Sequence, residues 1–160
     1  MKNIFLKTIA LFLFIVSTGC GISPNSPRWQ EKSAQLLADQ QAVLRQMNAV
    51  ASEKKIVYAA FALHSGSTSF QGDAVLVRDI LQSLNPRIPA LVLSNQLEIS
   101  DITYPFAQRK NIIQVLRSIA EVSDEDSLVF LLLASHGSPE ALSVKISHRY
   151  SKALTGGQLG

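Results

Sequence analysis

The spacing of apolar residues changes along this chain, and each spacing predicts a different kind of element. From Leu36 to Val50, apolar side chains return every three or four residues with glutamines and charged residues between them, which indicates an amphipathic helix. Ser26 can cap that helix and Pro27 suits its first position, so we predict a helix from about residue 27 to residue 52. We interpret its apolar stripe as a packing face.

Three continuous apolar runs follow, and each predicts a strand: residues 56–63, 90–93 and 127–134. Two segments of helical period lie between these runs. Their apolar positions are Val77, Ile80, Leu81 and Leu84, before a stop at Asn85-Pro86, and then Ile112, Leu116 and Ile119. Strands that alternate with helices favour a mainly parallel sheet with helices on its faces. We therefore predict a three-layer α/β domain.

The third run leads directly into the polar turn Ser135-His136-Gly137-Ser138-Pro139. This pattern is typical of a buried central strand whose carboxyl end opens into a site. Ligands of parallel sheets bind outside the carboxyl ends of the strands, and His64 and His136 both follow such ends. Imidazole is well suited to proton transfer near neutral pH, so His136 is the leading catalytic candidate. We interpret His64 as a loop residue beside the cleft.

The carboxyl-terminal part of the pattern is unusual. Residues 142–146 predict a short strand, and residues 154–160 resemble the start of another helix. The run 127–134 is apolar on both faces, which calls for neighbours on both edges, yet only two other main strands are available. We therefore expect one bare sheet edge and a domain that is incomplete at its carboxyl terminus.

The amino-terminal residues have the organisation of a secretory signal. Lys2 and Lys7 flank the start, residues 9–16 are apolar, and small residues precede Cys20, the single cysteine. This arrangement resembles a bacterial lipoprotein signal, with cleavage after residue 19 and a lipid on Cys20. An ordinary signal peptide and an uncleaved anchor are the alternatives. If Cys20 is lipidated, the mature protein has no free thiol and no disulfide.

Composition then excludes one class of partner. Without Lys2 and Lys7, 13 lysines and arginines face 12 acidic residues, so the net charge falls from +3 to +1. Such a balanced charge gives no electrostatic footprint for a nucleic acid. About 140 residues remain, which is enough for one domain with its own core.

Over residues 56–146 the sequence resembles the legumain-like family of cysteine peptidases, which share the caspase-type fold. The segments that carry the resemblance are residues 72–78, Val92-Leu93-Ser94-Asn95, Tyr104-Pro105-Phe106-Ala107 and above all Ser135-His136-Gly137-Ser138-Pro139. The resemblance implies peptide hydrolysis by a thiol, a caspase-like strand order and no cofactor or metal. It also implies that His136 is the general acid/base and that the Gly137 N–H binds the oxyanion.

The chain departs from that family in its nucleophile. The family places a cysteine at the end of the next main strand, but no cysteine follows Gly137, and the family's asparagine near the end of the first strand has no clear match. We therefore expect the 160-residue chain to be inactive as a peptidase. Three explanations stay open: a fragment of a longer peptidase-like lipoprotein, a decayed gene product, or a short protein that uses the half-site for binding.

Other chemistries find less support. An α/β-hydrolase would require a Gly-x-Ser-x-Gly elbow, and none is present. The spacing of His64, His136 and His148 matches no common metal-ligand motif. We interpret Asp124-Glu125-Asp126 as a solvated turn.

These interpretations divide the chain into four parts: a signal peptide (1–19), a tether (20–27), an amino-terminal helix (28–52) and a partial caspase-like peptidase domain (53–160). The expected function is that of a cysteine-type endopeptidase-like protein acting on a peptide or protein substrate. The alternative is an inactive, membrane-tethered lipoprotein that binds a peptide or protein partner. The expected location is the bacterial cell envelope, with the outer membrane or the periplasmic face favoured.

Overall fold

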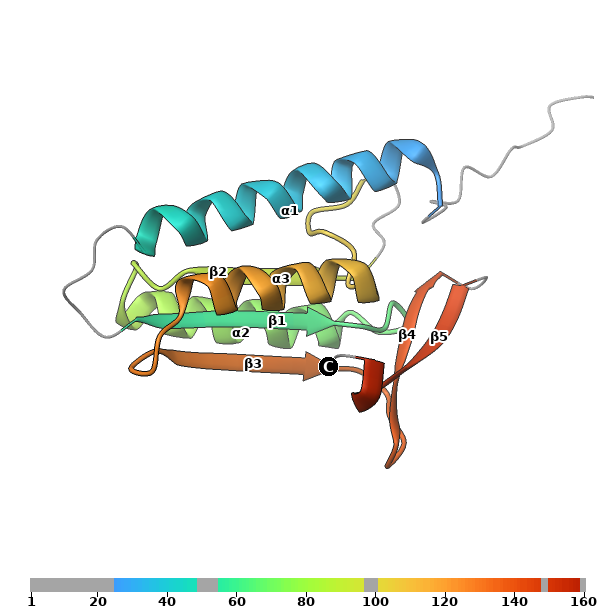
Figure 1. Cartoon of the computed structure of the whole chain (residues 1–160). Coiled ribbons are helices and arrows are strands. Elements are labelled where there is room, and N and C mark those ends of the chain that lie inside the picture. The colour runs from blue at the N-terminus through green and yellow to red at the C-terminus, as the bar shows by residue number, and fades with distance from the viewer. Residues whose placement is uncertain (1–24, 49–54, 97–100, 148–149, 159–160) are drawn as a thin grey trace, which may run out of the picture.

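A three-stranded parallel sheet organises the fold, as the computed structural model shows for residues 25–48, 55–96, 101–147 and 150–158 (Figure 1). Its strands are β1 (Ile56–Ala62), β2 (Ala90–Ser94) and β3 (Leu128–Ala134). Their order in the sheet is β2-β1-β3, and both pairings are parallel. The three predicted strands and the mixed α/β class are therefore confirmed.

Two helices cover opposite faces of this sheet, α2 (Ser69–Leu84) and α3 (Arg109–Val122). Side chains of β1 alternate between the two faces because the side-chain period of a strand is two residues. Phe61 packs in the core under α3, whereas Tyr58 packs under α2 beside Ala74. The Tyr58 hydroxyl donates a hydrogen bond to the Ala74 carbonyl (2.9 Å), which satisfies a buried polar group. The three-layer prediction is confirmed.

The amino-terminal helix α1 (Pro27–Asn48) lies beside α3 and along the outer edge of β2 (Figure 1). Its first turn is closed by the Ser26 carbonyl, which accepts hydrogen bonds from two backbone N–H groups. Leu37 and Leu44 enter the main core, and the Gln40 side chain donates to the Val92 carbonyl of β2 (3.0 Å). This helix therefore covers one edge of the sheet. The predicted residues 49–52 of the helix lie outside the described residues.

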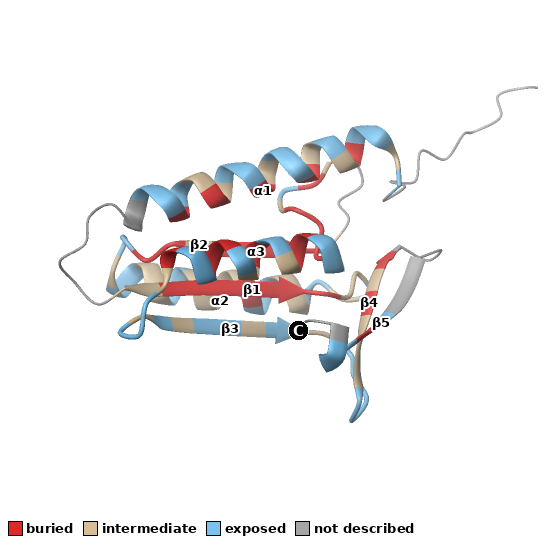
Figure 2. Ribbon diagram, in the orientation of Figure 1, coloured by how far each residue is buried: buried red, intermediate tan, exposed pale blue. Residues whose placement is uncertain are grey.

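The other edge of the sheet is β3, and here the sequence prediction was wrong in one respect. The strand is not central and buried: β1 is central, and β3 pairs only with β1 among the described residues. Side chains on both faces of β3 are therefore partly open to solvent, with Leu131 50% exposed and Phe130 42% exposed (Figure 2). The expectation of a bare sheet edge is confirmed within the described part of the chain.

An antiparallel hairpin follows the sheet, formed by β4 (Ala141–Ser147) and β5 (Tyr150–Thr155). The prediction of a strand at 142–146 is confirmed. The prediction of a helix start at 154–160 was wrong: Leu154 and Thr155 belong to β5, and Gly156–Gln158 forms a single 3-10 turn. Leu154 is buried because it pairs opposite Leu142 and reaches the main core, a long-range contact that local spacing does not reveal.

Candidate functional site at the carboxyl end of the sheet

His64 and His136 lie at the carboxyl ends of β1 and β3, the two strands that pair through seven residues each. Because the strands are parallel and in register, the loops that follow them emerge side by side. The two imidazole rings are in contact, with 4.6 Å between their centroids and an angle of 82° between their planes. The sequence placed both histidines at the carboxyl ends of strands, and the structure shows in addition that their rings are in direct contact.

Phe70, in the first turn of α2, completes a cluster of three rings. Its ring centroid lies 5.0 Å from that of His136 and 5.9 Å from that of His64, both in edge-to-face arrangements. Such contacts fix the plane of the His136 ring while leaving its nitrogens without a partner among the described residues. Sequence reasoning did not single out Phe70, because a phenylalanine at the start of an amphipathic helix carries no signal beyond packing.

The hydrogen bonding of His64 defines its protonation. Its Nδ1 accepts a hydrogen bond from the Gly66 N–H (2.9 Å), so the proton of the neutral ring lies on Nε2. Burial lowers the pKa of His64 below its ordinary value of 6.5, and the neighbouring His136 and Lys145 lower it further. A Cβ at residue 66 would lie 2.5 Å from the His64 ring, so a larger residue there would require the ring to shift. These effects disfavour the charged form of His64 beside His136.

The turn that carries His136 is fixed to the hairpin. The His136 carbonyl accepts a hydrogen bond from the Ser143 N–H (2.8 Å), and the Ser135 hydroxyl donates to the Ser143 carbonyl. A Cβ on Gly137 would lie 3.2 Å from the Leu142 side chain and 3.3 Å from the Ala141 carbonyl oxygen. A glycine therefore lets the chain turn closely against the hairpin here. No described residue accepts a hydrogen bond from the Gly137 N–H.

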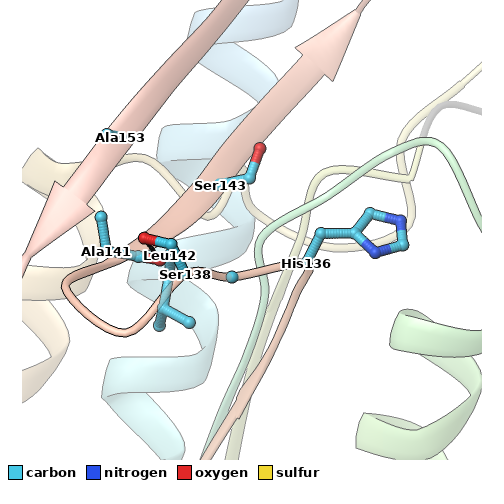
Figure 3. Close-up of a pocket in the computed structure, with 7 residues that line it drawn as sticks. His136, Ser138, Ala141, Leu142, Ser143 and Ala153 are labelled. Carbon is cyan, nitrogen blue, oxygen red and sulfur yellow. Dashed lines mark hydrogen bonds between the residues drawn. The ribbon is translucent and has the colours of Figure 1, made fainter.

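A pocket of about 380 Å³ opens between this turn and the hairpin. It is lined by His136, Gly137, Ser138, Ala141, Leu142, Ser143 and Ala153. Figure 3 shows the His136 imidazole directed away from Ala141 and Leu142, so that the backbone of the turn lines the pocket and the ring stands at its side. His136 is exposed, whereas His64 is partly buried.

The base of the site is a buried polar network centred on Asn95. The Asn95 side chain donates to the carbonyls of Leu63 (2.8 Å) and Ala107 (3.2 Å) and accepts from the Ala107 N–H (2.9 Å). Asn95 is fully buried, so these bonds are made without competition from water. They join the ends of β1 and β2 to the segment before α3. Asn95 belongs to one of the segments that carry the family resemblance. In the structure its side chain holds the ends of β1 and β2 against the segment before α3.

Cys20, the predicted lipid attachment site, lies outside the described residues, as do the predicted signal peptide and most of the tether. The third histidine, His148, lies outside them too. Within the described ranges, no three His, Cys, Asp or Glu residues come close enough to form a metal site. In the same part of the chain, no helix has both the length and the apolar character needed to cross a membrane.

Comparisons with known proteins add no relative to this description. No protein-family model matches the chain, and neither a curated protein nor a solved structure matches it.

Proposed function

We propose that this chain carries the histidine half of a thiol-dependent, peptide-hydrolysing site of the legumain-like type, with a caspase-like strand order. The observation that supports this most is the placement of His136: an exposed imidazole at the carboxyl end of a parallel strand, followed by a glycine N–H with no partner among the described residues, beside a pocket. The exposed imidazole can exchange protons with a substrate, and the N–H can donate to a developing oxyanion.

In the proposed reaction, a thiolate attacks the carbonyl carbon of the scissile peptide bond after its proton has passed to His136. The Gly137 N–H donates a hydrogen bond to the resulting oxyanion. His136 then gives the proton to the leaving amine, and a water molecule, deprotonated by His136, hydrolyses the thioester and regenerates the thiol. His136 therefore acts as base and acid in turn. The residues after His136 in this sequence include no cysteine, so they do not supply the thiol.

We also propose that a lipid on Cys20 tethers the protein to the bacterial envelope. This places the site on the outer membrane or the periplasmic face, where the substrates are peptides or proteins. The small residues Thr18 and Gly19 directly before Cys20 support this part of the proposal, whereas Ser17 departs from the pattern, which usually has an aliphatic residue there.

The 160-residue chain alone is expected to be inactive, so the enzymatic proposal is tested with protein purified from its own cells, where a polypeptide that supplies the thiol is retained. We expect hydrolysis of a mixed peptide library to fall at least about 100-fold in His136→Ala, because general acid–base catalysis contributes about that much or more. His148→Ala makes the same chemical change at a position to which the resemblance gives no role, and we expect it to keep activity. Equal activity in wild type and His136→Ala would contradict the proposal.

A second candidate is binding without catalysis, which the pocket beside His136 supports. It predicts that extended peptides shift the backbone amide NMR signals of Gly137, Ser138 and Ser143 in the purified chain. Signals of α1, such as those of Arg45, should not move. Binding that shifts α1 but leaves the pocket unchanged would exclude this candidate.

A further inference from the structure

The His136 imidazole is held by other rings and not by a hydrogen bond. A histidine that transfers protons is ordinarily oriented by an acceptor, such as a carboxylate or a carbonyl oxygen, on one of its ring nitrogens. Among the described residues, the ring nitrogens of His136 have no hydrogen-bond partner, and no ion pair joins them to a carboxylate. The orientation of this side chain therefore depends on its ring contacts.

The geometry of these contacts defines a single ring plane. The His136 ring lies at 82° to the plane of His64 and at 89° to the plane of Phe70. Those two planes themselves cross at 70°. Only one orientation of a third plane is perpendicular to two planes that cross, so a rotation of the His136 ring would disrupt at least one edge-to-face contact.

Each of the two contacting rings is anchored by residues beside it in the sequence. The Nδ1 atom of His64 accepts a hydrogen bond from the Gly66 N–H (2.9 Å). Phe70 follows Ser69, whose N–H donates to the Ser67 hydroxyl oxygen (3.2 Å) and whose hydroxyl shares a hydrogen bond with the same oxygen (2.7 Å). Neither ring therefore depends on His136 alone for its position.

Backbone pairing with β4 fixes the separation of the two histidines. The residues on either side of His64 both bond to Lys145: its N–H donates to the preceding carbonyl (2.9 Å), and its carbonyl accepts from the following N–H (2.8 Å). Two residues earlier on the same strand, the Ser143 N–H donates to the His136 carbonyl (2.8 Å). One strand therefore holds both histidines, beyond the pairing of β1 with β3 that precedes them.

We propose that His64 and Phe70 are positioning residues of the candidate site, whose rings hold the His136 imidazole in the orientation that proton transfer requires. We call these two residues the ring clamp. The inference rests on the proposed function, because this orientation matters for catalysis only if His136 transfers protons. Ring contacts orient the imidazole without occupying its nitrogens, so both nitrogens stay open for the transfers.

Two substitutions of His64 separate its ring from its hydrogen bond. His64→Gln keeps an acceptor for the Gly66 N–H and removes the ring, whereas His64→Phe keeps a ring and removes the acceptor. The ring clamp predicts that His136 loses its fixed orientation in His64→Gln and retains it in His64→Phe. A role of the hydrogen bond alone predicts the reverse.

NMR spectroscopy of the purified full chain measures this orientation without a thiol or a substrate. In wild type we expect the three-bond Hα–Hβ couplings of His136 to be those of a single rotamer, and we expect the same in His64→Phe. In His64→Gln and in Phe70→Leu these couplings should move to the values of averaged rotamers. Phe130→Leu makes the same change six residues before His136 and should leave the couplings unchanged. Averaged couplings in wild type, or wild-type couplings in both His64→Gln and Phe70→Leu, would overturn the inference.

Steady-state hydrolysis tests the catalytic part, in protein purified from its own cells. Because positioning acts on the chemical step, we expect kcat to fall at least about tenfold in His64→Gln, with KM changed by no more than about twofold. The fall in His64→Phe should be smaller, no more than about threefold. A rise in KM with unchanged kcat would show that His64 binds the substrate and would overturn its positioning role.

The two measurements distinguish a failure of the ring clamp from a failure of the proposed function. Averaged His136 rotamers in a protein with His136-dependent hydrolysis would overturn the ring clamp alone. A single rotamer in a protein without such hydrolysis would overturn the proposed function.

Discussion

His136 owes its position to neighbours that come from three parts of the chain. His64 and Phe70 contact its ring, and Ser143 holds its carbonyl. The sequence identified His136 because its histidine and glycine follow an apolar strand. It could not reveal the contact with His64, because that contact depends on how the strands align in the sheet, which is set by pairing between residues about 70 positions apart.

The pKa of His64 makes stability depend on pH in a defined direction. Its folded-state pKa is lowered below 6.5, so the unfolded chain binds more protons in the window below 6.5. Stability from this residue is therefore present above pH 6.5 and is lost as the pH falls through the folded-state pKa. We expect urea unfolding of wild type to lose more stability between about pH 7 and about pH 5 than that of His64→Gln.

Glutamine is a suitable replacement for His64 because its carbonyl oxygen can still accept the hydrogen bond from the Gly66 N–H. Asp101 and Asp124 also have lowered pKa values, each mainly through a hydrogen bond from a lysine. They are present in both proteins, so the difference between the two curves reports His64. Identical acid dependence in the two proteins would show that His64 keeps its ordinary pKa.

At the scale of elements, the spacing of apolar residues predicted the three strands of the sheet and the helices between them. It did not predict which of the strands is central in the sheet. A run such as 128–134 predicts a strand wherever it lies, because its residues are β-compatible and apolar on both faces. Whether such a strand is central depends on how many partners the chain provides. Here β1 takes the central place and β3 the edge. In the described part of the chain β3 therefore has the apolar surface of a central strand but pairs with one neighbour only.

The carboxyl-terminal hairpin illustrates a second limit of sequence reasoning. Residues 154–160 resembled the start of a helix in the sequence. The antiparallel pairing of β5 with β4 overrides that local preference, because it buries Leu154 and satisfies the backbone of both strands. The same hairpin forms one wall of the pocket: the sequence predicted its first strand, β4, but not its second, β5, which contributes Ala153.

At the scale of the whole molecule, the two edges of the sheet differ. Helix α1 covers β2 and donates a side-chain hydrogen bond to it, whereas β3 has an open edge in the described structure. The candidate site lies at the carboxyl end of that open edge. Any strand that pairs with β3 therefore ends or begins beside His136, and it contributes side chains to the site. Our proposal joins the open edge and the imidazole: a strand that pairs with β3 would bring the thiol to His136.

Labelling of the native protein with a peptidyl, thiol-directed reagent, followed by mass analysis of the labelled peptide, tests this claim most directly. We expect one label on a cysteine other than Cys20, in a polypeptide that contains or copurifies with this chain, and we expect that label to be lost in His136→Ala and kept in His148→Ala. A label confined to Cys20, or labelling that is equal in wild type and His136→Ala, would contradict the account.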